Sequence, residues 1–295
     1  MNIKTIQHNI LSWYVKHGRK LPRRQTTDPY AIHISEVMLQ QTQVDRVIPY
    51  FHQRMKDFPD YQSLANASKT DLLKHRSGLR FNSRALRLQA CAQTIMENWK
   101  LKIENWLVFR NWLVLEWGKL EIRNWADVSA LRAELQKLPW IGPYTSAAIM
   151  SFARNLPVPV IDTNIRRVLI FLFKLPETIT VKELEVFAIK VIPKGKSRDR
   201  HNALMDQWAL LLTARKTKIK PLNKQSRFEG SDRQVRWRTM KQLVKRSLFA
   251  KEGEGDLNMK DIKEEFPHKE VKKIVKELQK EGLIQIKKWI VSIAE

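Results

Sequence analysis

The segment LPWIGPYTSAAI at residues 138–149 constrains the fold more than any other part of this 295-residue chain. Helical periodicity runs up to it, Gly142 and Pro143 interrupt that periodicity, and small residues then predict a second, closely packed helix. The pattern is typical of two helices joined by a tight hairpin. Such a hairpin presents backbone N–H groups at the start of its second helix, where a phosphate can bind.

A second segment, VIDTNIRRVL at residues 160–169, places Asp162 ahead of another apolar helix. Two interpretations stay open on this segment alone. In the first, Asp162 faces the molecule whose phosphate the hairpin binds. In the second, it only caps the following helix, with Asn164 and the apolar run after it as support.

Together these segments resemble the helix-hairpin-helix DNA glycosylases, in which the motif L-P-G-hydrophobic-G-x-x-T-A precedes a catalytic Asp by about twenty residues. Trp140 departs from the motif, because it stands where the first hairpin glycine usually does. Its bulk predicts either displaced backbone donors or an aromatic ring that faces DNA. Binding of a monovalent cation at the hairpin is a further possibility that the sequence leaves open. By the resemblance, the hairpin residues that contact DNA are Trp140, Ile141, Gly142 and Thr145.

The stretch DPYAIHISEVMLQQTQVDRVIPYF at residues 28–51 resembles the MutY-type adenine glycosylases almost position for position. Gln40 and Gln41, expected at the DNA, favour this adenine branch, since the related thymine mismatch enzymes carry two arginines there. Glu36 lies in an otherwise apolar helical stretch, and burial favours the protonated form of a carboxylic acid. The alternative is a surface Glu that pairs along its helix.

The resemblance implies that two carboxylic acids share the chemistry. Glu36 would protonate adenine at N7, and Asp162, held by Asn164, would stabilise the sugar cation that forms as the glycosidic bond breaks. Tyr144 stands where strand-cutting relatives carry a Schiff-base lysine, so we expect base removal without strand cleavage. At the base pocket we expect Arg24 and Asp206.

The stretch GLRFNSRALRL at residues 78–88 is similar to the family's G-L-G-Y-Y-x-R-A-R-N-L, which supplies an aromatic wedge beside the opposing 8-oxoguanine. Phe81 can still intercalate, since a wedge needs an apolar plane rather than a hydroxyl. Arg84 is expected to contact DNA. Arg23 replaces the tryptophan of the family's L-P-W-R. Both departures lie near the base-reading surface, so they bear on specificity for adenine and 8-oxoguanine more than on glycosylase chemistry.

The formal net charge of +24 and the isoelectric point of about 10.2 predict a polyanionic partner. By the resemblance, this partner is double-stranded DNA with a mismatch or an oxidised guanine. A solvated basic surface is the alternative. The N-terminal stretch is amphipathic without an apolar core or a cleavage site, so we expect a cytoplasmic protein, nucleoid-associated if prokaryotic. We also expect a monomer with no membrane partner. Two rival functions are excision of mismatched thymine or uracil and DNA binding by a non-catalytic relic.

Cysteine usage departs from the family, which usually carries an iron–sulfur loop, C-x6-C-x2-C-x5-C, after a segment similar to LMDQWALLLTARK at residues 204–216. The only cysteine in the chain is Cys91. We therefore expect no iron–sulfur cluster and no other metal or cofactor apart from the open hairpin cation. An ungapped alignment puts four apolar residues at the ligand positions, Leu212, Ile219, Leu222 and Phe228. They form a hydrophobic plug or stand there by coincidence.

Strand signals are rare before residue 283, so we expect an all-α catalytic part with two lobes. By the resemblance, residues 21–157 form a helical barrel domain, whereas residues 1–20 and 158–228 form the second lobe, equivalent to the iron–sulfur domain. A Trp-rich insertion at about residues 97–125 stacks on unpaired bases or packs on itself.

Residues 231–295 leave the resemblance. Helices are expected at residues 234–250, 257–266 and 268–283, and a β-hairpin at 284–293. This order predicts a small winged-helix-like α+β domain rather than the Nudix-like domain of many MutY proteins. The third helix carries four lysines, which contact phosphates or form a solvated face with partners such as Glu277. They are Lys272, Lys273, Lys276 and Lys280.

Overall fold

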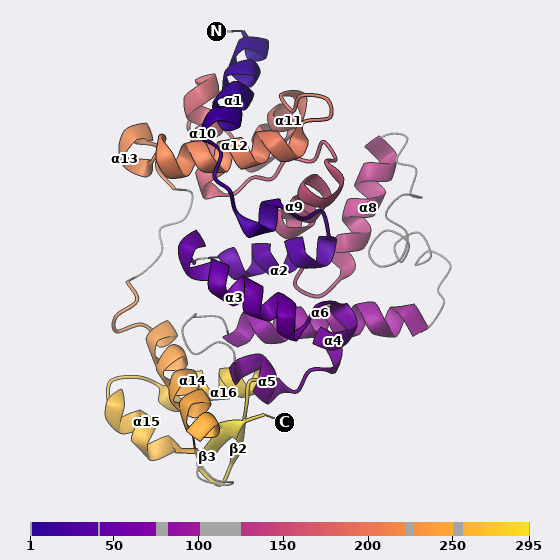
Figure 1. Ribbon diagram of the computed structural model, residues 1–295. Helices are drawn as coiled ribbons and strands as arrows, with labels where there is room; N and C mark the ends of the chain where they lie inside the picture. Colours follow the sequence, from indigo (N-terminus) through magenta and orange to yellow (C-terminus); the bar gives the residue numbers. More distant parts are fainter. Residues whose placement is uncertain are drawn as a thin grey trace. The chain divides into compact units, whose positions relative to one another are not determined.

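The computed structural model describes residues 2–40, 42–74, 82–100, 125–221, 227–249 and 256–294. These residues are mostly helical, with a small sheet near the C-terminus (Figure 1). The predicted fold class, all-α with a small α+β part at the end, is confirmed. In the described part of the chain, no helix has both the length and the apolar character needed to cross a membrane.

The chain forms two compact units, one of residues 1–37 and 98–224 and the other of residues 38–97 and 225–295. The predicted domain boundaries divide the chain differently and stay predictions. The first unit contains α1 (Ile3–His17), the 3-10 helix η1 (Pro22–Arg24), most of α2 (Pro29–Leu39), α8 (Trp125–Lys137), α9 (Pro143–Arg154), α10 (Thr163–Phe173), α11 (Val181–Lys190), α12 (Ser197–Leu210) and α13 (Ala214–Thr217).

One core of the first unit lies between α1, α10, α11 and α12. Ile6 and Ile10 occupy one face of α1, and both are buried against the apolar faces of the other helices. The spacing of four residues puts these two side chains on the same side of the helix. The Thr180 and Glu183 capping box fixes the start of α11. This core holds the start of α10, which Asp162 directly precedes, in a defined position.

The predicted hairpin joins α8 to α9. Leu138 and Ile141 are buried, whereas the Trp140 side chain is 59% exposed. The backbone of Trp140 has φ of 66°, in the left-handed region that favours glycine. The turn therefore keeps the conformation that a glycine would adopt, and the tryptophan ring lies exposed at its surface. A non-glycine residue in this conformation costs about 1 kcal/mol.

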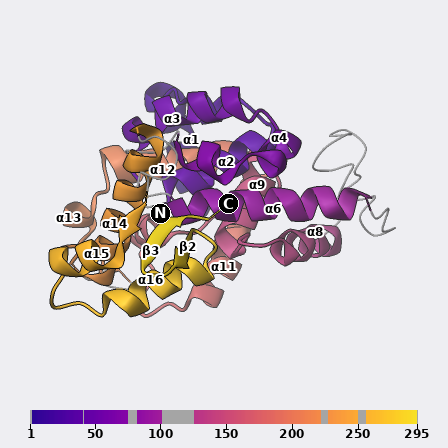
Figure 2. The same cartoon turned by 90° about the horizontal axis from the view of Figure 1, so that it is seen from below.

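The second unit contains α3 (Val44–Asp57), α4 (Tyr61–Asn66), α5 (Lys69–Lys74), α6 (Asn82–Lys100), α14 (Asp232–Phe249), β1 (Leu257–Asn258), α15 (Met259–Glu265), α16 (Val271–Lys280), β2 (Ile284–Lys287) and β3 (Ile290–Ile293). Its last part has the order helix, strand, helix, helix, strand, strand. The antiparallel sheet has the order β1-β3-β2, and Val291 of β3 lies between Leu257 and Ile286. Figures 1 and 2 show α14, α15 and α16 gathered around these strands.

The predicted three helices and β-hairpin of this part are confirmed, and β1 is an element that the sequence did not predict. We expected residues 257–266 to be helical throughout, but α15 starts at Met259. Leu257 and Asn258 instead pair with β3, and two residues are too few to show the alternation of a strand. Asn258 then caps α15 by accepting a hydrogen bond from the Lys260 N–H.

Substitutions of Trp140 test the strained turn. Trp140→Gly and Trp140→Val both remove the ring, but only glycine adopts a positive φ without strain. We expect the Gly variant to be more stable than the Val variant by about 1–2 kcal/mol, measured by urea denaturation. Equal stability of the two variants would show that this residue does not adopt the left-handed conformation.

Candidate active site

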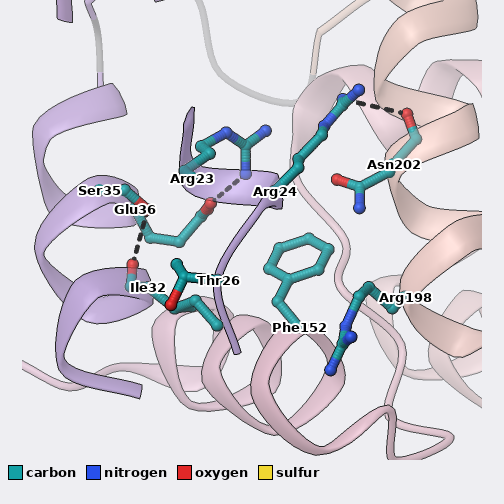
Figure 3. A pocket seen from close by; sticks show the side chains of 9 residues that line it. All are labelled: Arg23, Arg24, Thr26, Ile32, Ser35, Glu36, Phe152, Arg198 and Asn202. Atoms are coloured by element: carbon teal, nitrogen blue, oxygen red, sulfur yellow. Dashed lines mark hydrogen bonds and ion pairs between the residues drawn. The ribbon is translucent and has the colours of Figure 1, made fainter. Parts of the chain in front are cut away.

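Glu36 is a buried carboxylate, 2% exposed, that accepts hydrogen bonds on both of its oxygens. The Arg23 Nη1 atom lies 2.7 Å from Oε1, and the Tyr144 hydroxyl lies 2.8 Å from Oε2. These side chains come from η1, α2 and the first turn of α9. Figure 3 shows Glu36 reaching from α2 toward Arg23. Because each oxygen has a donor, the carboxyl group is fixed in orientation as well as in position.

Arg23 is itself enclosed, with its side chain 10% exposed. Its guanidinium carbon lies 5.8 Å from the centre of the Phe152 ring, and Nη2 lies 3.6 Å from the Met205 sulfur. A buried charge is costly without a partner, so Arg23 and Glu36 stabilise each other in the folded chain. The sequence showed Arg23 only as a departure from the family motif, and its pairing with Glu36 was not predicted.

Tyr144 links the two predicted catalytic acids electrostatically. Burial raises the pKa of its phenol well above the ordinary value, and the negative charges of Glu36 and Asp162 raise it further. The hydroxyl therefore keeps its proton and donates it to Glu36 in a hydrogen bond. The influence of both carboxylates on this one phenol places Glu36, Tyr144 and Asp162 in one electrostatic environment.

Asp162 is the N-cap of α10. Its Oδ1 atom accepts hydrogen bonds from the backbone N–H groups of Asn164 at 2.9 Å and Ile165 at 2.6 Å. Burial raises the pKa of the Asp162 carboxyl, while these backbone bonds and the positive charge of Arg167 act in the opposite direction. The capping interpretation is therefore correct for the local structure. It leaves room for a catalytic role, because the cap also fixes the direction of the carboxyl group.

A cavity of about 10 Å³, room for a single water, lies beside Glu36. It is too small for a base, so a base can enter only if side chains move. Its lining, drawn in Figure 3, comes from η1, the following loop, α2, α9 and α12. The lining residues are Arg23, Arg24, Thr26, Ile32, Ser35, Glu36, Phe152, Arg198 and Asn202.

Arg24 and Asp206, both predicted at the base pocket, form a buried ion pair. Arg24 contacts Asp206 through two nitrogens, at 2.7 and 2.8 Å, and the Arg19 Nε atom adds a contact of 2.6 Å. Burial alone would raise the pKa of Asp206, but hydrogen bonds from Arg24 and Arg19 outweigh it and hold that pKa below its usual value. Arg24 lines the cavity and Asp206 does not. The pair ties η1 to α12 and so positions Arg23.

The predicted DNA contacts divide into four groups. Trp140 is exposed, and nothing lies within 4 Å of the place where Gly142 would carry a Cβ. Ile141 and Thr145 are buried, so their side chains face the interior and only their backbone can reach DNA. In the second unit, the Arg84 guanidinium donates to the Gln40 carbonyl. Gln41, Phe81 and residues 101–124 of the Trp-rich insertion lie outside the described residues.

The four positions aligned with iron–sulfur ligands do not fit such a cluster. Leu212 and Ile219 are each 7% exposed, and Leu212 belongs to the core around α1 and α12. Phe228 makes an edge contact with the Trp237 ring, with 6.1 Å between centroids. Leu222 lies outside the described residues. None of these side chains carries a donor atom for iron, and Cys91 is buried on α6.

Comparisons with known proteins identify the class to which this geometry belongs. Residues 34–194 match the HhH-GPD superfamily of base excision DNA repair proteins. The match spans more than half of the chain, which therefore belongs to this superfamily. The matched residues include Glu36, Tyr144 and Asp162.

Curated relatives narrow the comparison to adenine DNA glycosylases. The chain is 34% identical to the adenine DNA glycosylase of Buchnera aphidicola subsp. Baizongia pistaciae, over 72% of this chain and 54% of that protein. It is 30% identical to that of Mycolicibacterium smegmatis, over 80% of this chain and 78% of that protein. The chain thus spans about half the length of the Buchnera relative.

Solved structures share the fold. A thermostable thymine-DNA glycosylase matches with a TM-score of 0.58 and 26% identity, covering 72% of this chain and 89% of that one. Endonuclease III in a trapped covalent complex with DNA matches with a TM-score of 0.55 over 75% of this chain and 91% of that one. At 17% identity, the second match concerns the fold alone.

Asp162→Asn tests the electrostatic account of this site. Asparagine caps a helix as well as aspartate does, but it avoids the cost of burying a charge. The pKa of Asp162 is raised in the folded protein, so ionisation of this carboxyl destabilises the fold. This destabilisation begins as pH rises past the ordinary pKa of 3.8 and is complete above the raised pKa. We expect Asp162→Asn to stabilise the protein at pH 7 by up to about 1 kcal/mol, and the gain to vanish near pH 3.5. Thermal melting of the variant and of the wild type at both pH values measures this difference. A variant that is less stable than the wild type at pH 7 but equally stable near pH 3.5 would contradict the account.

Proposed function

We propose that the protein is an adenine DNA glycosylase of base excision repair. It would hydrolyse the N-glycosidic bond of adenine opposite 8-oxoguanine or guanine in double-stranded DNA. The observation that carries the proposal is the buried Glu36, bonded to Tyr144 in an environment shared with Asp162. Membership of the superfamily and the names of the curated relatives support the same activity.

The proposed reaction needs a base turned out of the duplex, because the site lies within the folded unit. The bond between the sugar C1′ and adenine N9 breaks, and its electron pair leaves with the base. Glu36, in its protonated form, donates the proton to N7, while ionised Asp162 stabilises the positive charge on the sugar. Water then adds to C1′ and releases a proton. Tyr144 takes no part in bond breaking and keeps the Glu36 carboxyl in place.

Arg23 must move for this reaction to proceed. Its guanidinium occupies Oε1 of Glu36 and lines the small cavity next to it. Displacement of Arg23 opens space for the base and frees that oxygen to hold the proton. The ion pair therefore limits the entry of other bases, because each entering base must offset the cost of separating two buried charges.

The hairpin supports binding of a DNA phosphate. The first N–H groups of α9 have no acceptor within the helix. The open space around Gly142 shows that the fold itself does not require glycine at this position. Close approach of a ligand to the backbone is a physical reason to keep the position free of a side chain. The exposed Trp140 ring lies two residues away and is suited to contact the same strand.

The glycosylase is proposed to be monofunctional. Strand cleavage through a Schiff base needs a nucleophilic amine, and a phenol cannot form an imine. Tyr144 also has a raised pKa and keeps its proton at neutral pH. The product would be a full-length strand with an abasic site.

A second candidate activity is excision of thymine from T·G mismatches. The solved thymine-DNA glycosylase with 26% identity favours it. Gln40 and Gln41 argue against this activity, since the thymine mismatch enzymes that the sequence resembles carry two arginines at these positions. Assays on both kinds of duplex separate the two activities.

Variants of the two acids test the catalytic assignment. Glu36→Gln and Asp162→Asn should each lower single-turnover excision of adenine opposite 8-oxoguanine by at least about 1,000-fold, because each removes a group that acts in the transition state. Duplex binding should change little, since phosphate contacts supply most of the affinity. Excision by either variant at the wild-type rate would refute the assignment.

Asp28→Asn is the matched control. Asp28 also accepts backbone hydrogen bonds at a helix start, from Tyr30 and Ala31, and burial also raises its pKa. Asp28→Asn should excise at the wild-type rate.

The same reactions, analysed with and without hot alkali, show whether the protein itself cuts the DNA strand. Alkali-independent cleavage that disappears in Asp162→Asn would contradict monofunctional action.

We also propose that buried apolar residues replace an iron–sulfur cluster, so the purified protein should be colourless and contain no iron. Leu212→Ser should destabilise it by about 1–3 kcal/mol, because Leu212 packs in the core of α1 and α12. Leu211→Ser is the control, since its neighbour Leu211 is 40% exposed. Stoichiometric iron in the purified protein, or equal melting of the two variants, would contradict the proposal.

A further inference from the structure

The turn between β2 and β3 exposes an aromatic ring at the tip of a two-residue hairpin. Trp289 is 54% exposed, and the next residue, Ile290, is 46% exposed. Lys288 and Trp289 both have positive φ, 45° and 73°. Positive φ at both central residues is what a tight two-residue β-hairpin turn requires, and Lys287 and Ile290 pair directly on either side of it. The Trp289 carbonyl accepts a hydrogen bond from the Met259 N–H at 2.8 Å, which anchors the turn to the start of α15.

Lysines from two helices flank this ring. The Lys272 Nζ atom of α16 lies 4.5 Å from the Trp289 ring centre, and the Lys263 Nζ atom of α15 lies 5.5 Å from it. An open concavity of about 440 Å³ lies beside the ring, within the range of about 300–1,000 Å³ of ligand pockets. It is lined by Asn258, Lys260, Lys263, Lys288 and Trp289.

The basic surface continues along α16. Lys272, Lys276 and Lys280 are spaced four residues apart, so they form one exposed stripe opposite the buried apolar face of the helix. Glu277 pairs instead with Arg236, at 3.6 Å. Ion pairs also occur at this surface, namely Lys260 of the concavity with Glu264 at 3.9 Å, Lys273 with Glu270 at 3.7 Å and Arg236 with Glu281 at 2.6 Å. The stripe itself keeps its positive charge available.

We propose that this surface is a second DNA-binding site, in which Trp289 stacks on an unpaired nucleobase and the lysines contact the adjacent phosphates. The concavity has one flat aromatic wall, and its other walls are polar or cationic. It therefore fits a ligand with one flat face and several negative charges, which is the chemistry of a nucleotide within a strand. A lipid headgroup has the charge without the flat face. All of these residues belong to the second unit, so the site is independent of Glu36 and Asp162.

Equilibrium binding of the full-length chain to a fluorescent single-stranded oligonucleotide tests this site. We expect Trp289→Ala to weaken binding by at least about 5-fold, as loss of one stacked base does. Trp289→Phe should restore most of the affinity, since it restores a stacking plane. Lys272→Gln should weaken binding and reduce the salt dependence by about one phosphate contact. Lys245→Gln, an exposed lysine of α14, is the charge-matched control and should change neither quantity.

Two further measurements separate this proposal from the glycosylase activity and from other ligands. Glu36→Gln should bind the oligonucleotide like wild type, and Trp289→Ala should still excise adenine when protein is saturating. Thermal melting checks that each variant is folded. Unchanged oligonucleotide affinity of folded Trp289→Ala would overturn the proposal. So would a loss confined to binding of phosphatidylserine vesicles, which would assign the surface to lipid.

Discussion

The buried pair of Arg23 and Glu36 is the interaction on which the rest of the candidate active site depends. An unpaired carboxylate in the interior costs several kcal/mol, on the order of the stability of a whole domain. The 2.7 Å contact with Arg23 offsets this cost, and the hydroxyl of Tyr144 satisfies the second oxygen. Three sequence segments must meet for this to happen, η1, α2 and the hairpin. The ion pair of Arg24 with Asp206 holds η1 against α12 and so supports the whole arrangement.

Three departures from the family pattern keep local structure while changing chemistry. Trp140 adopts the left-handed conformation of the glycine it replaces. Arg23, in place of a tryptophan, brings a positive charge to the Glu36 carboxyl. Leu212 is buried at a position that aligns with a cysteine of the family's iron–sulfur motif. Each replacement is compatible with the surrounding packing, so the fold tolerates a divergent site.

Much of the fold and of the site could be predicted from the sequence, because the signals were local. Gly142, Pro143 and the apolar periodicity around them predicted the hairpin, and Asp162 is the N-cap that its position before an apolar run indicated. The pairing of Arg23 with Glu36 could not be predicted, since it depends on how η1 packs against α2. The strand β1 was missed because two residues carry no periodicity, and its pairing with β3 is set by tertiary packing.

The base released by the wild-type protein tests the central claim most directly. A single-turnover reaction with duplexes carrying adenine opposite 8-oxoguanine, and thymine or uracil opposite guanine, can be analysed by mass spectrometry of the free bases. The proposed roles of the buried Glu36 and of Asp162, which both act electrostatically on Tyr144, predict free adenine from the first duplex, in an amount equal to the abasic strand. Release of thymine or uracil alone, or of no base by protein that binds each duplex, would contradict the account.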